Sequence, residues 1–248
     1  MNNKNKIALI TGAAQRIGKA IAQELHSQGI DVAIHYGHSL KEAEILKKEL
    51  NTIRSNSAEV FQYDLSGKES PKKLINNVKR HFGRIDYLVN NASIFYPTPF
   101  NQYKKEDLDS FLQINFFQTV KLSQLAYPLL KQNSGSIVNI IDIYAQRGLE
   151  DHTAYVASKA ALLEATKNLA IEFAPEVTVN AVSPGAILWP ESDVDLNHES
   201  QQLIIQNTAL KRRGQVKDIS KTVAYLLTQA NYSTGSLINV DGGRRLYI

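Results

Sequence analysis

The sequence predicts an α/β fold, with a doubly wound parallel sheet of about seven strands in a single domain over residues 1–248. Two observations predict it. Short apolar runs alternate along the chain with longer segments of helical period, as is typical of a parallel sheet with helices on both faces. With 248 residues, 43% of them hydrophobic, the chain can form one large core, and neither an internal repeat nor a low-complexity linker divides it.

The strands are predicted at the apolar runs, which are rich in β-branched residues. They cover residues 6–11, 31–36, 59–63, 85–90, 136–141, 177–182 and 236–240. Between them, the helical period predicts helices at 17–28, 40–54, 71–82, 106–131, 154–173 and 199–206, and a further one after residue 216. Right-handed crossovers then place helices on both faces of the sheet.

The least regular segment, residues 186–197, is polar and acidic and shows no clear period. It follows a predicted strand and precedes a predicted helix. We interpret residues 186–210 either as a mobile flap over a substrate site or as a plain surface loop. Trp189, the only tryptophan, is either an anchor of this flap or a substrate contact.

The composition argues against several classes of function. The net charge is +4, but the 28 basic residues are spread among 24 acidic ones, which favours a solvated surface and small anionic ligands over nucleic acid. The chain has no cysteine, and its six histidines show no paired metal-ligand spacing, so we expect no catalytic metal. No apolar run approaches the ~20 residues of a membrane span, and the first residues do not read as a secretory signal. We expect a soluble, cytoplasmic protein with no membrane partner.

A glycine-containing turn follows the first predicted strand. Residues 11–18 read TGAAQRIG, and a helix is predicted directly after them. Gly12 permits a tight turn and Gly18 a close approach of the helix, so that backbone N–H groups at the helix start can bind a pyrophosphate. Arg16 replaces the middle glycine of the usual fingerprint, but the order of strand, turn and helix is the required one. We therefore expect a dinucleotide cofactor.

The residues after the second predicted strand favour NADPH over NADH. An acidic residue about 20 positions past the glycines would bind a ribose 2′-OH. This chain instead has HYGHS there and no acid before Glu42. Arg16, His38 and Ser39 can surround a 2′-phosphate with a fixed charge, a titratable donor and a hydroxyl. After the third strand, Asp64 can accept a hydrogen bond from the adenine amino group.

A tyrosine and a lysine four residues apart indicate a catalytic pair. Tyr155 and Lys159 fall in a predicted helix, so they share one face and can point into one cleft. A lysine ammonium lowers the pKa of a nearby phenol from ~10 toward working pH, which makes Tyr155 a usable proton donor. Asp142 ends the preceding apolar run, thirteen residues before the tyrosine, and we expect it to be a third member of the site. Burial would raise the pKa of Asp142 and Lys159 would lower it, so the net direction stays open.

The glycine turn TGAAQRIG, the segment YVASK that holds Tyr155 and Lys159, and four other features occur in the order found in the short-chain dehydrogenase/reductase family. The chain resembles this family over essentially its whole length. The others are NNAS at 90–93, Asn115 in the long predicted helix, SPGA at 183–186 and VDGG at 240–243. The resemblance implies a Rossmann-type fold, a nicotinamide cofactor and a homotetramer. It also implies hydride transfer with Tyr155 as proton donor, Lys159 at the nicotinamide ribose and Asn115 supporting a proton-relay water. The cofactor contacts that we expect are Gly12, Arg16, Ile17, Gly18, His38, Ser39, Asp64, Leu65, Asn91, Ala92, Ser93, Tyr155, Lys159, Pro184 and Gly185.

Most members of the family carry a serine where this chain carries Asp142. An aspartate there, an arginine in the glycine loop, HY-x-x-S after the second strand and NNAS followed by FYPTP resemble the pteridine reductases of the family. This resemblance implies NADPH-dependent reduction of a pterin or folate substrate, such as dihydrobiopterin, dihydromonapterin or dihydrofolate. The substrate contacts that we expect are Arg16, Ser93, Phe95, Asp142 and Tyr155.

The chemistry of a pterin suits these residues. A pterin is flat and aromatic with polar edges, so its site needs a stacking ring and in-plane polar partners. Phe95 can supply the ring, with ordinary wall packing as the other interpretation, while Ser93 and Arg16 reach the polar edge. A hydroxyl suits a ketone oxygen. Reduction of a ring C=N instead needs a proton on nitrogen, which a carboxyl at Asp142 beside Tyr155 can carry.

Two other functions stay open at this point. One is a short-chain reductase of carbonyls, such as a 3-oxoacyl thioester or a sugar, in which Asp142 is a drifted serine. The other is a non-catalytic NADPH-binding protein, which would have no need of an activated phenol at Tyr155. The combination of Arg16, Phe95 and Asp142 discriminates between these functions and pterin reduction.

Overall fold

The chain folds into one parallel sheet, as the sequence predicts. The computed structural model describes residues 5–67, 70–189 and 197–247. Within these ranges seven strands pair in the order β3-β2-β1-β4-β5-β6-β7, and all neighbours are parallel. The strands are β1 (Ile7–Ile10), β2 (Asp31–Tyr36), β3 (Ala58–Gln62), β4 (Tyr87–Asn90), β5 (Ser136–Ile140), β6 (Thr178–Pro184) and β7 (Leu237–Val240).

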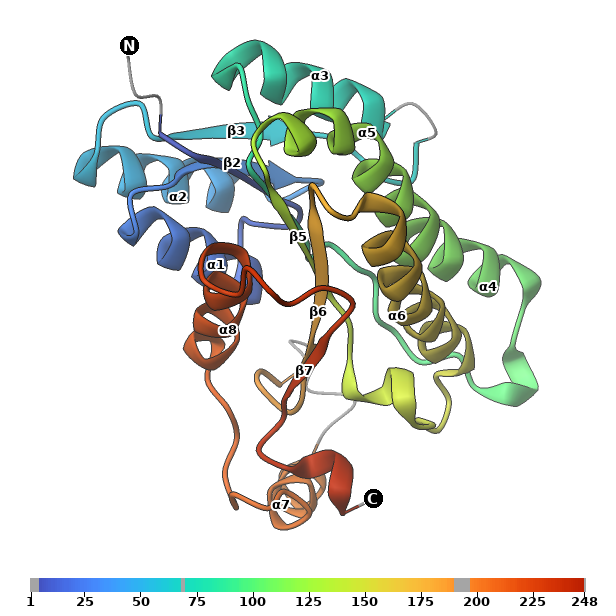
Figure 1. Cartoon of the computed structure of the whole chain (residues 1–248). Helices are drawn as coiled ribbons and strands as arrows, with labels where there is room; N and C mark the ends of the chain where they lie inside the picture. Colours follow the sequence, from blue (N-terminus) through green and yellow to red (C-terminus); the bar gives the residue numbers. More distant parts are fainter. Residues whose placement is uncertain (1–4, 68–69, 190–196, 248) are drawn as a thin grey trace.

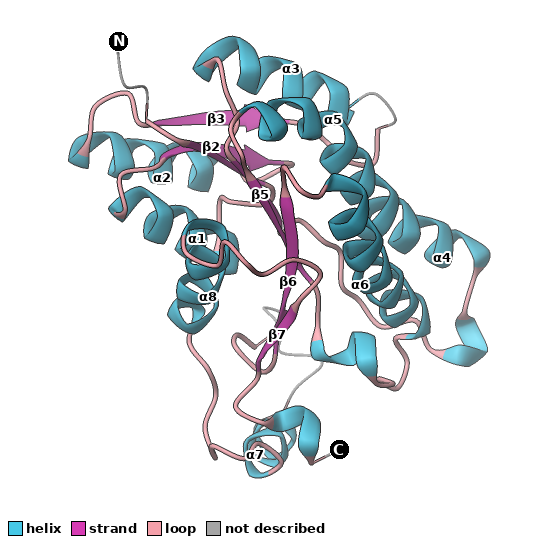
Figure 2. Cartoon of the chain, viewed as in Figure 1, coloured by secondary structure: helices cyan, strands magenta, loops and turns pink. Residues whose placement is uncertain are grey.

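Helices cover both faces of the sheet (Figure 1). Helices α1, α2 and α8 pack on one face, and α3, α5 and α6 pack on the other. Figure 2 shows α7 apart from both layers, beside the C-terminal end of the chain. The helices are α1 (Arg16–Ser27), α2 (Leu40–Ile53), α3 (Ser70–Phe82), α4 (Lys105–Phe111), α5 (Gln118–Gln132), α6 (Thr153–Phe173), α7 (His198–Gln206) and α8 (Val216–Thr228).

Each face of the sheet has its own apolar cluster. On the first face, Ile21 and Leu25 of α1 are buried with Val223 of α8 against the strands. On the second, Leu74 of α3 and Leu122 of α5 are buried in the same way. Complete burial of one such side chain contributes roughly 1.5–3 kcal/mol. The apolar residues that recur with helical period in the sequence therefore account for the packing of helices on both faces of the sheet.

The structure corrects the single helix predicted over residues 106–131. Helix α4 passes at Leu112 into a π-helical segment, η2 (Leu112–Phe117), before α5 begins. A π turn holds one more residue than an α turn, so it changes the helical phase while leaving the apolar pattern almost unbroken. Asn115 lies inside this segment.

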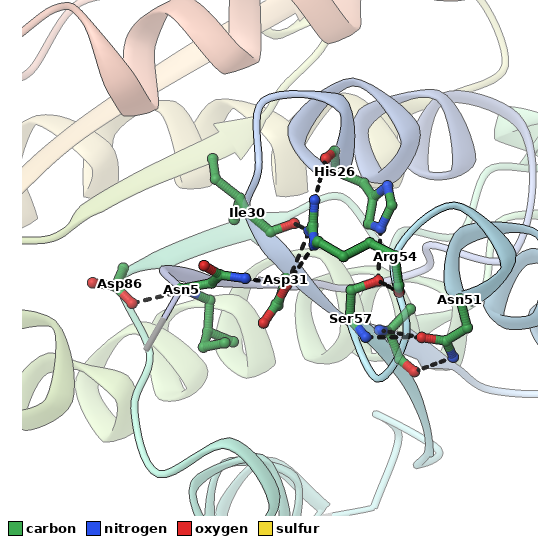
Figure 3. Close-up of polar contacts among 10 residues, drawn as sticks. Asn5, His26, Ile30, Asp31, Asn51, Arg54, Ser57 and Asp86 are labelled. Carbon is green, nitrogen blue, oxygen red and sulfur yellow. Dashed lines mark hydrogen bonds and ion pairs between the residues drawn. The ribbon is translucent and has the colours of Figure 1, made fainter. Parts of the chain in front are cut away.

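A cluster of hydrogen-bonded polar side chains lies at the amino ends of the strands, at the edge of the sheet opposite the carboxyl ends (Figure 3). The guanidinium of Arg54 donates to Asp31 Oδ1 at 2.9 Å and to the backbone oxygens of Ile30 and His26 at 2.8 and 3.0 Å. The His26 ring is hydrogen-bonded to Ser57 Oγ at 2.7 Å, and burial lowers the pKa of His26. These contacts fix α1, β2 and the end of α2 relative to one another.

Within residues 5–67, 70–189 and 197–247, no helix is long and apolar enough to cross a bilayer. In the same ranges, no three His, Asp or Glu side chains are grouped closely enough to hold a metal ion.

Candidate active site

The candidate site lies at the carboxyl edge of the sheet, where the strand order reverses between β1 and β4. A cavity of about 1170 Å³ opens there. The segments after β1, β4, β5 and β6 line it, so it gathers predicted residues that are far apart in the sequence. The predicted residues in its wall are Gly12, Arg16, Ile17, Gly18, Ser39, Asn91, Ala92, Ser93, Phe95, Asp142, Tyr155, Lys159, Pro184 and Gly185.

The turn after β1 has the backbone that a pyrophosphate site requires. Gly12 has a φ of 61°, in the left-handed region that favours glycine. A side chain at Gly18 would collide with the carbonyl oxygen of Gly12 and with the amide of Asn91. That amide donates to the backbone oxygens of Thr11 and Gly12 at 2.9 and 3.0 Å. The loop after β4 therefore holds the glycine turn in place.

His35 also holds this turn. Its Nδ1 accepts a hydrogen bond from the Gly12 backbone N–H at 3.1 Å, and its Nε2–H donates to the Tyr63 oxygen at 2.9 Å. Burial lowers the pKa of His35 to about 4, so the ring is neutral at pH 7. Sequence analysis missed this role, because a histidine within an apolar strand looks like a core residue. Its place at the end of β2, next to the glycine turn, is the signal that could have found it.

Three predicted cofactor residues lie outside the cavity wall. His38 is exposed, Leu65 is buried, and Asp64 is exposed in the loop after β3. The two carboxylate oxygens of Asp64 accept from Ser66 N at 2.8 Å and from Ser66 Oγ at 2.7 Å. These bonds lower the pKa of Asp64, and the nearby charge of His38 lowers it further. The two loops are thus neighbours beside the cavity, and the cofactor contacts of all three residues stay predictions.

Arg16 connects the glycine turn to the predicted flap. Its Nη2 donates to the backbone oxygen of Trp189 at 3.3 Å, and the guanidinium of Arg213 lies 5.6 Å from the centre of the Trp189 ring. These contacts agree with the interpretation of Trp189 as an anchor. Of the predicted flap, residues 190–196 lie outside the described residues, and α7 forms half of the remainder.

The predicted catalytic residues meet at the end of β5. The Tyr155 phenol donates to Asp142 Oδ2 at 2.7 Å, and the backbone N–H of Tyr144 donates to Asp142 Oδ1 at 2.9 Å. The Lys159 ammonium donates to the backbone oxygen of Ile140 at 3.0 Å. It also lies 5.9 Å from the centre of the Tyr155 ring. The Tyr144 bond fixes the carboxyl, and the phenol and the carboxyl form one partly buried hydrogen-bonded pair.

Burial controls the ionisation of this group. It raises the pKa of Asp142, against the opposing hydrogen bonds and the charge of Lys159. It lowers the pKa of Lys159 to about 8. The pKa of Tyr155 is raised well above its usual value by burial and by the Asp142 carboxylate. The expected lowering of the pKa of this phenol is therefore wrong for the protein alone, since burial and the Asp142 carboxylate raise it.

Asn115 is buried behind the cavity wall. Its Oδ1 accepts from Ile94 N at 2.9 Å, and its Nδ2 donates to Ile94 O and to Ser158 Oγ, both at 3.1 Å. Ser158 Oγ in turn donates to the backbone oxygen of Tyr155 at 2.7 Å. The side chain of Asn115 thus joins the loop after β4 to α6. Its support of a proton-relay water stays a prediction.

Phe95 stands beside the phenol. Its side chain is 49% exposed, packs edge-on against Tyr155 with the ring centres 4.7 Å apart, and stacks on His152 at 4.8 Å. This exposure argues against simple core packing. His152 was not predicted as a site residue, although it lies one helical turn before Tyr155 and lines the cavity.

Two further residues of the cavity wall were missed. Tyr144 lies two residues after Asp142, and Arg244 follows the VDGG motif near the end of the chain. Arg244 Nη2 donates to the Tyr144 hydroxyl at 3.1 Å. The two positions are 100 residues apart, so their contact could not be read from spacing.

The fold, the glycine turn and the group of Asp142, Tyr155 and Lys159 define an oxidoreductase of the dinucleotide-binding α/β class. A family model described as enoyl-(acyl carrier protein) reductase matches residues 12–245. The chain belongs to the short-chain dehydrogenase/reductase family.

The proteins similar to this chain in sequence and those similar to it in structure carry different names. By sequence, it is 35% identical to the 3-oxoacyl-[acyl-carrier-protein] reductase FabG of Staphylococcus epidermidis over 96% of this chain and 98% of that protein. The corresponding protein of Haemophilus influenzae is 36% identical over 97% and 98%. By structure, it is similar to FolM alternative dihydrofolate reductase 1 from Brucella suis in complex with NADP, with a TM-score of 0.90, 33% identity and 98% and 96% coverage. A blue fluorescent protein from a metagenomic library, in complex with NADPH, has a TM-score of 0.90, 31% identity and 98% and 99% coverage.

Proposed function

We propose that the protein is an NADPH-dependent reductase of dihydropterins, such as dihydrobiopterin, dihydromonapterin or dihydrofolate. The observation that carries this proposal is the partly buried Asp142 carboxyl, which accepts the Tyr155 O–H at 2.7 Å and has a raised pKa. A carboxyl with a raised pKa can hold a proton for a ring nitrogen, whereas a serine hydroxyl is suited to a ketone oxygen. The similarity to a structure named alternative dihydrofolate reductase supports it.

The glycine turn and the loops beside it fit a dinucleotide. Gly18 has no side chain, so the start of α1 packs closely on the turn and the backbone of the turn can approach a pyrophosphate. No acidic residue that could bind a ribose 2′-OH follows β2 before Glu42. Arg16, His38 and Ser39 would bind the 2′-phosphate of NADPH, and Lys159 the nicotinamide ribose. Bound NADPH supplies the hydride. The similar structures in complex with NADP and with NADPH support this choice of cofactor.

Phe95 and Ser93 suit a flat heterocycle. The Phe95 ring is half exposed in the cavity wall and stands against Tyr155, so a pterin stacked on it would lie next to the phenol. Ser93 is exposed in the same wall and offers a hydroxyl to the polar edge of the pterin. Arg16 would approach that edge from the glycine turn.

The proton path runs through the Asp142–Tyr155 pair. When Asp142 is protonated, it donates to the phenol oxygen as the phenol gives its own proton to the substrate nitrogen. The pair then needs no phenolate, which agrees with the raised pKa of Tyr155. Tyr144 fixes the carboxyl through its backbone N–H during this transfer.

A second candidate is reduction of a 3-oxoacyl thioester. The identities of 35% and 36% to two FabG proteins favour it, since they extend over almost the whole of each chain. A carboxylate at position 142 would then hold Tyr155 in place without carrying a proton. A non-catalytic NADPH-binding protein is the third candidate, and it would have no use for the buried Lys159.

The decisive experiment is a substrate panel. We expect NADPH consumption with dihydrobiopterin, dihydromonapterin or dihydrofolate, and much lower kcat/KM with acetoacetyl thioester. Quinonoid dihydropterin serves as a further comparison substrate. A preference for the thioester would contradict the proposal, and NADPH binding without turnover of any substrate would favour the non-catalytic candidate.

A further inference from the structure

The C-terminal segment places one arginine inside the molecule. Gly242 and Gly243 have φ values of 62° and 78°, and side chains there would press against Thr208 and Ala209. The backbone N–H of Leu210 donates to Gly242 O at 3.0 Å. The turn is therefore tight against the segment after α7, and the residue that follows it, Arg244, is directed inward.

Arg244 is a buried cation that forms no ion pair with the described residues. Arg244 is 7% exposed, and the two groups that its guanidinium contacts are neutral. Nη1 donates to Ile204 O at 3.0 Å and Nη2 to the Tyr144 hydroxyl at 3.1 Å. The nearby Asp241 uses its two oxygens for the backbone N–H groups of Gly243 and Arg245. A buried charge is costly unless it is paired, so a use for this one is expected.

Capping of α7 explains only part of this arrangement. Ile204 lies in the last turn of α7, where a cation is favourable. Capping of α7 would not require Arg244 to contact Tyr144 or to lie in the cavity wall. Arg244 does contact Tyr144, and both residues line the cavity. Because the Tyr144 oxygen accepts from Arg244, its own hydrogen is left to donate.

We propose that Arg244 and Tyr144 together bind a carboxylate on the substrate. A carboxylate can accept from the guanidinium and from the phenol at once, and it supplies a negative charge that none of the described residues supplies to Arg244. The backbone of Tyr144 holds Asp142, so this subsite is one tyrosine side chain away from the proton-donating pair. It therefore binds a group beyond the reacting ring, on the tail of the substrate.

This inference rests on the proposed reduction of dihydropterins and names the class of pterin. Dihydrofolate carries carboxylates on its tail, whereas the tail of dihydrobiopterin carries only hydroxyl groups. The subsite favours the acidic tail. A phosphate could present similar oxygens, as in a coenzyme A thioester, and the experiment below separates that source.

The test is the ratio of kcat/KM for dihydrofolate to kcat/KM for dihydrobiopterin. Arg244→Met should lower this ratio by about 10- to 100-fold, mainly through the KM for dihydrofolate, because charge-assisted hydrogen bonds are lost. Arg244→Lys should lower it less, since a charge is kept. Tyr144→Phe should lower it in the same direction, and Arg245→Met, which removes a neighbouring exposed charge, should not change it.

Calorimetric titration with unreduced folate and with biopterin provides a readout independent of turnover, and Arg244→Met should weaken the binding of folate selectively. Circular dichroism and melting temperature establish that each variant is folded. If Arg244→Met does not fold, Arg244→Lys and Tyr144→Phe decide the outcome. Equal losses for both pterins would overturn the proposal and leave Arg244 as a support of α7.

The wild-type panel separates this inference from the proposed function. Reduction of both pterins with an unchanged ratio in the variants contradicts the carboxylate subsite alone. Reduction of none of the three dihydropterins in the panel contradicts the proposed function. The alternative result is that Arg244→Met lowers kcat/KM for acetoacetyl-coenzyme A, leaves kcat/KM for a phosphate-free acetoacetyl thioester unchanged, and leaves the ratio for the two pterins unchanged. That result would assign the subsite to a phosphate and overturn the proposal of a carboxylate.

Discussion

The imidazole Nδ1 of His35 accepts the backbone N–H of Gly12 at 3.1 Å, so the glycine turn depends on a neutral histidine. The pKa of His35 is lowered from 6.5 to about 4. The folded protein therefore resists protonation more than the unfolded chain, and stability is full above pH 6.5 and is lost as pH falls toward 4. We expect His35 to remove about 2 kcal/mol of the free energy of unfolding between pH 7 and pH 5, measured by urea denaturation.

His26 acts in the same direction, because burial lowers its pKa too. The matched variant is therefore His35→Gln, whose amide can accept from Gly12 and donate to Tyr63 without titrating. Its free energy of unfolding should fall less between pH 7 and pH 5 than that of the wild type. The same pH dependence in both proteins would show that His35 is not the titrating group.

Arg16 is expected to select NADPH. Replacing it with alanine removes the charge nearest the expected 2′-phosphate, at a cost of about 1.5–3 kcal/mol for a lost charge-assisted bond. In steady-state kinetics, Arg16→Ala should lower kcat/KM for NADPH far more than for NADH. Arg80→Ala, which removes an exposed charge on α3, should leave the cofactor ratio unchanged. Comparable kcat/KM for the two cofactors in the wild type would contradict the choice of NADPH.

Phe95 is expected to stack on the pterin. Loss of a base–aromatic stack costs about 1–3 kcal/mol, so Phe95→Ala should raise the KM for the pterin by roughly 5- to 150-fold. Phe100→Ala is the matched control, because Phe100 is 89% exposed and lies outside the cavity wall. Unchanged pterin kinetics in a folded Phe95→Ala variant would leave the ring with a packing role only.

The family resemblance implies a homotetramer, and exposed apolar residues at the start of α5 and on α6, which cover the same face of the sheet, allow this to be tested. Phe117, at the end of η2 where α5 begins, and Ile171, in α6, are 55% and 77% exposed, as suits apolar subunit contacts. Light scattering should give four times 27.7 kDa, about 111 kDa. Phe117→Asp and Ile171→Asp should lower this mass, whereas Tyr232→Asp, at a fully exposed position, should not. A monomeric wild type would contradict the expectation.

The strands could be predicted well from the sequence, because the length of each apolar run and the period of the helices between them reflect which residues are buried locally. All seven strands lie within two residues of their predicted ends, and the main miss was the π segment around Asn115. Motifs found Asp142, Tyr155 and Lys159 because their spacing is fixed along one strand and one helix. Arg244 could not be found in this way, since its contact with Tyr144 spans 100 residues.

The electrostatics of the site were the least predictable part. A lysine four residues from a tyrosine suggests a lowered phenol pKa, but the pKa of Tyr155 depends on its burial and on Asp142. Both are consequences of tertiary packing. The same packing settled the direction for Asp142, whose pKa is raised because desolvation exceeds the effect of Lys159.

Asp142 is expected to carry a proton during pterin reduction. Its raised pKa keeps part of the carboxyl protonated at a higher pH than usual, and that fraction falls as pH rises. Pterin turnover should therefore be faster on the acidic side of neutrality and decline through a macroscopic pKa shared by Asp142, Tyr155 and the substrate. Above the pKa of Lys159, about 8, loss of its charge should reduce activity further.

Asp142→Asn keeps the shape of the side chain and removes its ionisable proton, so kcat for the pterin should fall by roughly 10²–10⁴, the range for a general acid. The decline of the remaining rate as pH rises through the shared pKa should disappear. Asp142→Ser restores the group common in the family and should shift the ratio of kcat/KM values from pterins toward acetoacetyl thioester. Near-normal pterin turnover in Asp142→Asn, with the wild-type pH profile, would show that the carboxyl only holds Tyr155 in position through their 2.7 Å hydrogen bond.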